Sequence, residues 1–85
     1  MAYTARIEIR IRPDILDPEA DAIAKALLGL GFTGTGQVRR ARVIEVDMEA
    51  ADEAAASTQA TDMGRRLLAN PVMEDVNITV LPRQR

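Results

Sequence analysis

The stretch "YTARIEIRIRP", residues 3–13, sets the pattern from which the fold follows. Apolar side chains occupy its odd positions and polar side chains occupy its even positions, from Tyr3 to Arg12. Successive side chains of a strand point to opposite faces, so this alternation predicts a half-buried strand. Pro13 has no N–H to donate to a neighbouring strand and is expected to end it.

A helix is predicted next, because the sequence carries helix signals at both ends of the segment. Asp17 is a favourable N-cap and Pro18 suits the first helical position. Gly31 is expected to stop the helix in the left-handed conformation. Apolar residues repeat between them at helical spacing and are expected to be buried: Ala20, Ile23, Ala24, Leu27 and Leu30.

Three further strands are expected downstream. The glycine-rich turn "FTGTGQ" leads into a short strand at Gln37–Arg40, and a tight connection near Ala41 leads into a longer strand at Val43–Met48. The last strand is expected from Glu74 to Leu81, with Val76, Ile78 and Val80 on its inner face.

A second helix is predicted from Asp52 to Asn70. Gly64 costs about 1 kcal/mol relative to Ala inside a helix, so it is expected to mark a close backbone approach. Asn70 is expected to be left-handed, and Pro71 follows it as a helix terminator. The residues expected to face the sheet are Ala56, Ala60, Met63 and Leu67.

The order strand, helix, strand, strand, helix, strand predicts an α+β fold of the split βαβ, ferredoxin-like type. Residues 1–85 are expected to form one domain, with a four-stranded antiparallel sheet and two helices on one of its faces. The other face would carry the charged side chains of the first strand, open to solvent or to a partner.

The amino-acid composition argues against several kinds of functional site and several classes of protein. The 85 residues contain no Cys and no His, which removes thiolate metal sites, a Cys nucleophile and the commonest general base. The net charge of −2 and the 2% aromatic content argue against nucleic-acid binding, which uses basic surfaces and stacking rings. No apolar run approaches the roughly 20 residues of a membrane span, and we expect a cytoplasmic chain.

The residues alone favour a binding or assembly role over catalysis. Gly34 and Gly36 are better explained by turn formation than by a phosphate loop, since the third glycine and the helix start are missing. The basic cluster Arg39, Arg40 and Arg42 is either a solvated hairpin tip or a contact for an anion or an acidic partner.

Three stretches resemble the PurS family, small accessory subunits of phosphoribosylformylglycinamidine (FGAM) synthase in purine biosynthesis. They are "LDPEADAIAKAL" at 16–27, "VRRARVIEV" at 38–46 and "LLANPVMED" at 67–75. The resemblance implies a non-catalytic subunit that holds a PurL-like synthetase and a PurQ-like glutaminase together and assists ammonia transfer. It also implies a homodimer or a dimer of dimers.

On that resemblance this chain would carry no catalytic residue, cofactor ligand or metal ligand. ATP and Mg would be used by the synthetase subunit. The residues that match the family motifs are expected to shape the contact surfaces: Asp17, Pro18, Arg39, Arg42, Asn70, Pro71 and Glu74.

Two other functions remain open from the residues. A free-standing ligand-sensing oligomer of the same topology would bind an amino acid or an anion between protomers. A nucleic-acid-binding domain of this fold would need an aromatic platform on its sheet, which the sequence lacks.

Overall fold

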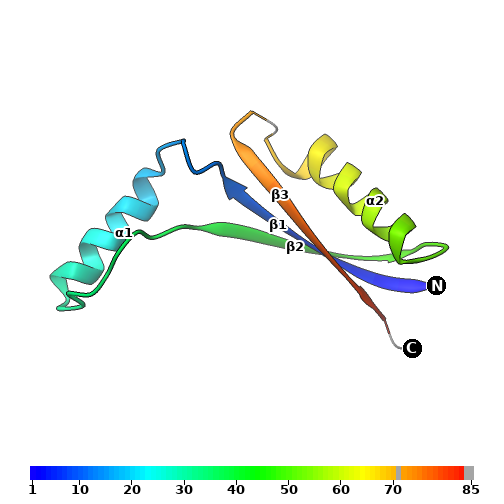
Figure 1. The fold of residues 1–85 in the computed structure, drawn as a ribbon, viewed down its shortest axis with the longest axis horizontal. Coiled ribbons are helices and arrows are strands. Elements are labelled where there is room, and N and C mark those ends of the chain that lie inside the picture. The colour runs from blue at the N-terminus through cyan, green and yellow to red at the C-terminus, as the bar shows by residue number, and fades with distance from the viewer. Residues whose placement is uncertain (71, 84–85) are drawn as a thin grey trace.

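The chain, in a computed structural model, is described over residues 1–70 and 72–83 (Figure 1). Its strands are β1 (Ala2–Ile11), β2 (Ala41–Glu49) and β3 (Glu74–Pro82). Its α-helices are α1 (Pro18–Gly29) and α2 (Glu53–Met63), and α2 runs directly into a π-helical turn, η1 (Gly64–Leu68). The fold is therefore α+β, as the sequence predicts.

Within the described residues the sheet has three antiparallel strands in the order β2-β1-β3, so the prediction of four strands is wrong. Residues 37–40 form no strand and run without a turn into β2 (Figure 1). Pairing between β1 and β2 stops at Arg10 and Ala41, because β1 ends at Ile11. Residues 37–40 thus extend past the end of β1, and no strand among residues 1–70 and 72–83 pairs with them.

The core lies between α2 and the inner face of the sheet. Ile7 occupies its centre, fully buried and paired with Ile44 on one side and Ile78 on the other. The buried side chains of the cluster are Tyr3, Ala5, Ile7, Ile9, Met48, Ala56 and Ala60. The alternation of β1, the alternation of Val43–Met48 and the alanine spacing of α2 correctly predict this set. The small alanines let the helix approach the sheet closely.

The end of the second helix departs from the predicted spacing. The N–H of Ala69 donates to the carbonyl of Gly64 at 2.9 Å, an i→i+5 bond that inserts one residue into the turn. Leu68 consequently packs on the core, whereas Leu67, predicted to be buried, is 83% exposed. Gly64 does mark a close approach, but to a side chain of the sheet and not to another backbone as predicted, since a Cβ there would lie 2.8 Å from Val76 Cγ1.

The prediction that both helices cover the sheet is wrong for α1. In Figure 1, α1 lies beyond the end of the sheet, beside the segment that leads back to β2. Ala20 is its one buried residue, while Ile23 and Leu30, predicted to be buried, are exposed. We call residues 17–40 the arm. The spacing of the apolar residues in α1 predicts an apolar helix face. It does not predict which surface, in the same chain or in a partner, packs against that face.

The departure of α1 leaves part of the inner sheet face uncovered. Helix α2 packs chiefly over β3 and β1. On the β2 side of the same face, Ile44 and Val46 are only partly buried. The molecule is accordingly long and thin, with extents of 50 × 30 × 14 Å.

Candidate functional site

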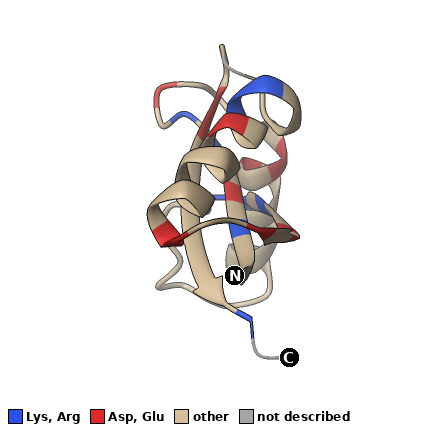
Figure 2. Ribbon diagram, turned by 90° about the vertical axis from the view of Figure 1, so that its right-hand side faces the viewer, with Lys and Arg blue, Asp and Glu red and all other residues tan. Residues whose placement is uncertain are grey.

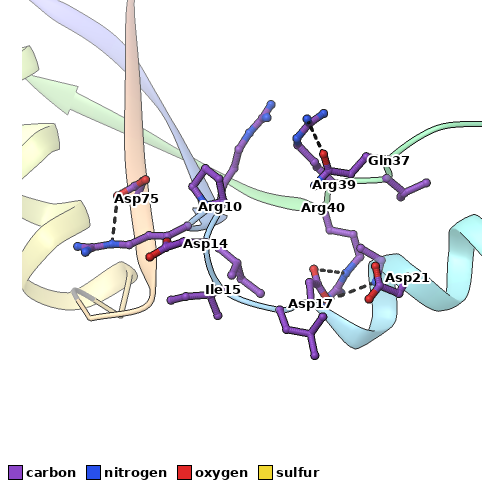
Figure 3. Close-up of a pocket in the computed structure, with 15 residues that line it drawn as sticks. Arg10, Asp14, Ile15, Asp17, Asp21, Gln37, Arg39, Arg40 and Asp75 are labelled. Atoms are coloured by element: carbon purple, nitrogen blue, oxygen red, sulfur yellow. Dashed lines mark hydrogen bonds and ion pairs between the residues drawn. The ribbon is translucent and has the colours of Figure 1, made fainter.

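The base of the arm is closed by one arginine and two carboxylates, which we call the Arg40 clasp: Asp17, Glu19 and Arg40. Arg40 Nη2 lies 2.9 Å from Asp17 Oδ1, and Arg40 Nε lies 3.2 Å from Asp17 Oδ2, so the pair is bidentate. Arg40 Nη1 lies 2.7 Å from Glu19 Oε2. Figure 3 shows the Asp17–Arg40 contact at the start of α1.

Asp17 also performs the capping role that the sequence predicts. Its Oδ1 accepts hydrogen bonds from the N–H groups of Glu19 and Ala20, at 3.2 and 3.3 Å. The hydrogen bond from Arg40 lowers the pKa of Asp17 below its usual range, with further lowering by these N–H groups. One carboxylate therefore starts the helix and anchors the arginine that precedes β2.

A second cluster lies at the start of β3, and we call it the Arg42 cluster: Arg42, Leu68, Asn70 and Glu74. Arg42 Nη2 contacts both oxygens of Glu74, at 3.1 and 3.2 Å, and the carbonyl of Leu68 at 3.3 Å. The N–H of Asn70 donates to Glu74 Oε1 at 2.8 Å. This N–H, and then Arg42, lower the pKa of Glu74.

Asn70 ends the helix by a different device from the one predicted. Among the described residues no residue other than glycine has a positive φ, so the left-handed assignment for Asn70 is wrong. Its side-chain Oδ1 instead accepts hydrogen bonds from the N–H groups of Val72 and Met73, at 3.0 and 3.4 Å. This is an Asx turn, which asparagine forms readily. Gly31, at φ +99°, is left-handed as predicted.

The structure brings the predicted contact residues together in part. Arg42, Asn70 and Glu74 share one cluster, and Asp17 and Pro18 begin α1. Arg39 joins neither cluster, because its side chain bonds Gln37 at 2.9 Å. Pro71 lies outside the described residues.

Sequence reasoning missed Arg40 as a distinct residue. Three arginines stand within four positions, and composition does not separate them. The alternation of β2, extended towards the N-terminus, separates them. It places Arg40 on the same face as Arg42 and Arg39 on the opposite face.

A cavity of about 500 Å³ lies between the arm and the end of the sheet (Figure 3). Its lining mixes apolar residues such as Ile15 and Val38 with charged ones such as Arg10 and Asp75. Its lining residues supply carboxylates and guanidinium groups, and they include no Ser, Thr, Cys, His or Lys. The described residues also contain no group of three acidic, His or Cys side chains placed to hold a metal ion.

The distribution of charged residues and the exposed apolar side chains indicate a surface for binding other proteins. Acidic and basic residues are interspersed in Figure 2, without a continuous basic stripe in that view. The arm exposes several large apolar side chains at once: Ile23, Leu28, Leu30 and Phe32. Exposed apolar side chains gathered on one segment are typical of an interaction surface. Within the described part of the chain, no helix is long and apolar enough to cross a membrane.

Comparisons with known proteins agree on one family. The family model described as "PurS: Phosphoribosylformylglycinamidine (FGAM) synthase" matches residues 4–82. A relative from Synechocystis, named phosphoribosylformylglycinamidine synthase subunit PurS, is 45% identical over 87% of this chain and 74% of its own length.

Solved structures agree as well. The crystal structure of PurS from Methanocaldococcus jannaschii is 30% identical, with a TM-score of 0.86, and the match covers 96% of this chain and 99% of the other. It is described as one of the subunits of formylglycinamide ribonucleotide amidotransferase in the purine biosynthetic pathway. A chain in the structure of PurLQS from Thermotoga maritima shares the fold, at a TM-score of 0.86 and 22% identity over 95% of this chain and 99% of that one.

Proposed function

Because this chain belongs to the PurS family of FGAM synthase, we propose that it is the non-catalytic subunit that joins the synthetase and glutaminase subunits of that enzyme. The enzyme converts formylglycinamide ribonucleotide into formylglycinamidine ribonucleotide, using ATP and glutamine. The observation that carries the proposal is the family match over residues 4–82, nearly the whole described chain.

The chemistry of the chain supports a bridging role. Transfer of ammonia between two active sites requires that the two sites be held together, and proximity alone contributes strongly to such coupled steps. The cavity at the base of the arm contains carboxylates and guanidinium groups that pair with one another, as Asp17 does with Arg40. We assign ATP and Mg to the PurL-like synthetase and glutamine cleavage to the PurQ-like glutaminase, both in the cytoplasm.

A second copy of the chain is the first partner that we propose. In the part of the chain that the structure describes, helix α1 exposes apolar side chains such as Ile23 and Leu28, and α2 packs chiefly over β3 and β1, which leaves the β2 side of the inner sheet face uncovered. If two copies exchange arms, α1 of each copy covers the β2 side of the other copy's inner sheet face. One contact then buries both exposed apolar surfaces. The resulting contact is isologous, as expected of a homodimer.

Complex formation tests the proposal. The synthetase and glutaminase of the same organism should co-elute from a sizing column when this chain is added and should separate when it is left out. Co-elution of the two large subunits in its absence, unchanged by its addition, would contradict the bridging role. A free-standing ligand-sensing module, the alternative function, would leave both elution profiles unchanged.

A further inference from the structure

We propose that Arg40 is a positioning residue, which closes residues 17–40 into a rigid arm and so holds the apolar face of α1 outward for a second copy of this chain. This inference rests on the proposed function, because it deepens the self-association proposed there. It assigns the Arg40 clasp a role in assembly beyond its effect on α1 itself.

The first support is the small amount of packing that otherwise fixes α1. Ala20 is the single buried residue of the helix, and it lies in the first turn, next to the clasp. Leu28 is 48% exposed and Leu30 is 75% exposed near the far end of the helix. Because α1 buries so few apolar side chains, apolar packing does little to fix its direction. The contacts at its base therefore fix that direction.

The second support is the geometry of the clasp. Asp17 and Arg40 are 23 residues apart in sequence, and their contact joins the two places where the arm leaves and rejoins the body of the molecule. The Asp17 side chain is only 14% exposed, and the contact uses two parallel N–H donors. Bidentate arginine–carboxylate pairs fix orientation as well as distance, unlike the usual pair of mobile surface charges.

The third support is the double use of Asp17. Because its Oδ1 caps α1 and accepts from Arg40, the helix axis and the chain entering β2 share one anchor atom. Any rotation of α1 about its base must break the contact with Arg40 or remove the cap. Arg40 therefore couples the direction of α1 to the sheet through Asp17.

The test uses variants that separate positioning from helix capping. Arg40→Gln removes the charged fork, and Asp17→Asn keeps a good N-cap while removing the charge. Arg66→Gln is the control, since Arg66 lies in η1, outside the arm, and pairs with Asp62. The chain has no cysteine, so Ala26→Cys and Gln59→Cys, both at exposed positions, place two spin labels on α1 and α2.

Three quantities are measured: the label–label distance distribution in labelled chain diluted into excess unlabelled chain, the self-association constant by sedimentation, and helix content by circular dichroism. In the unsubstituted chain we expect one narrow distance. Arg40→Gln and Asp17→Asn should each broaden it and weaken self-association about tenfold, in the range typical of coupling between separate contacts. The double variant should be little worse than either single one. Helix content should be unchanged, and Arg66→Gln should match the unsubstituted chain.

The inference is overturned if the clasp variants keep the narrow distance, or if self-association falls only in step with helix content. The distance measurement distinguishes a failure of the inference about Arg40 from a failure of the proposed function. A monomeric chain whose distance still broadens on loss of the clasp would refute the proposed dimer and keep Arg40 as the positioning residue of the arm.

Discussion

Arg42 and Glu74 pair across an intervening strand. Arg42 lies near the start of β2 and Glu74 at the start of β3, and β1 lies between these two edge strands. Their closest approach is 3.1 Å, from Nη2 to Oε1. Because Arg42 also holds the carbonyl of Leu68, and Glu74 the N–H of Asn70, the pair ties both sheet edges to the end of η1.

Glu74→Gln should lower the free energy of unfolding. The amide keeps an acceptor for the N–H of Asn70 but loses the charge that Arg42 binds. We expect a loss of about 1 kcal/mol, which is less than for a buried charged hydrogen bond because Arg42 is largely exposed. Urea melts of the two proteins at neutral pH measure it, and identical midpoints would mean that the pair adds nothing.

The same variant should have a distinct pH dependence. The pKa of Glu74 is lowered from its ordinary 4.5, so folding favours the ionised carboxylate. Its contribution is therefore present above about pH 4.5 and is lost as the pH falls through the lowered pKa. The stability difference between the unsubstituted chain and Glu74→Gln should shrink below pH 4.5, and a difference that grew on acidification would contradict the assigned direction.

Asn70→Ala should be at least as stable as Asn70→Gly. Both lose the Asx turn to Val72 and Met73, at about 1 kcal/mol for the lost hydrogen bonds. Since φ of Asn70 is not positive, glycine adds backbone entropy cost without relieving strain. Denaturant melts of both variants decide the matter. A clearly more stable glycine variant would indicate the left-handed conformation that the structure does not have.

Gly64→Ala should be destabilising although alanine is the better helix former. The added Cβ would meet Val76 Cγ1 at 2.8 Å, too close for a real contact. We expect a loss of about 1 to 3 kcal/mol from overpacking, partly offset by helix propensity. Val76→Ala opens the space, so the double variant should lose less than the sum of the two single losses. Additive losses would place the strain elsewhere.

Leu28→Ser on α1 should weaken self-association and leave the unfolding of the core unchanged. Leu28 is 48% exposed and belongs to the arm, whereas Val43→Ser, at a residue 42% exposed on the opposite sheet face, is the control. Light scattering over a dilution series should show a lower mass for Leu28→Ser at concentrations where Val43→Ser remains associated. Equal masses would remove the arm from the interface.

The sequence predicts the local elements well and their mutual placement less well. The alternation of β1, the cap at Asp17 and the stop at Gly31 depend on neighbouring residues, and all three are present. Within the described residues, the absence of a fourth strand depends on where β1 ends relative to β2, and the position of α1 depends on contacts between residues far apart in sequence. No local pattern encodes either. The register that stops pairing at Ala41 accounts for the strand, since β1 ends at Ile11.

In the candidate site too, the contact between residues close in sequence was predictable and the contact between distant residues was not. Asn70 and Glu74 are four residues apart, and their contact follows from one turn. The contact of Asp17 with Arg40 spans the whole arm, and sequence reasoning selected Arg39 and Arg42 in its place. Long-range pairs of this kind become visible only when the path of the chain between them is known.

We propose that this chain joins two active sites and forms neither. The direct measurement is FGAM formation by reconstituted synthetase and glutaminase, with and without this chain, driven either by glutamine or by a high concentration of ammonium salt. Without this chain the glutamine-driven rate should collapse, while the ammonium-driven rate should persist, because free ammonia needs no transfer between subunits. An ammonium-driven rate that fell as steeply as the glutamine-driven one would contradict the account, since the chain would then shape the synthetase active site itself.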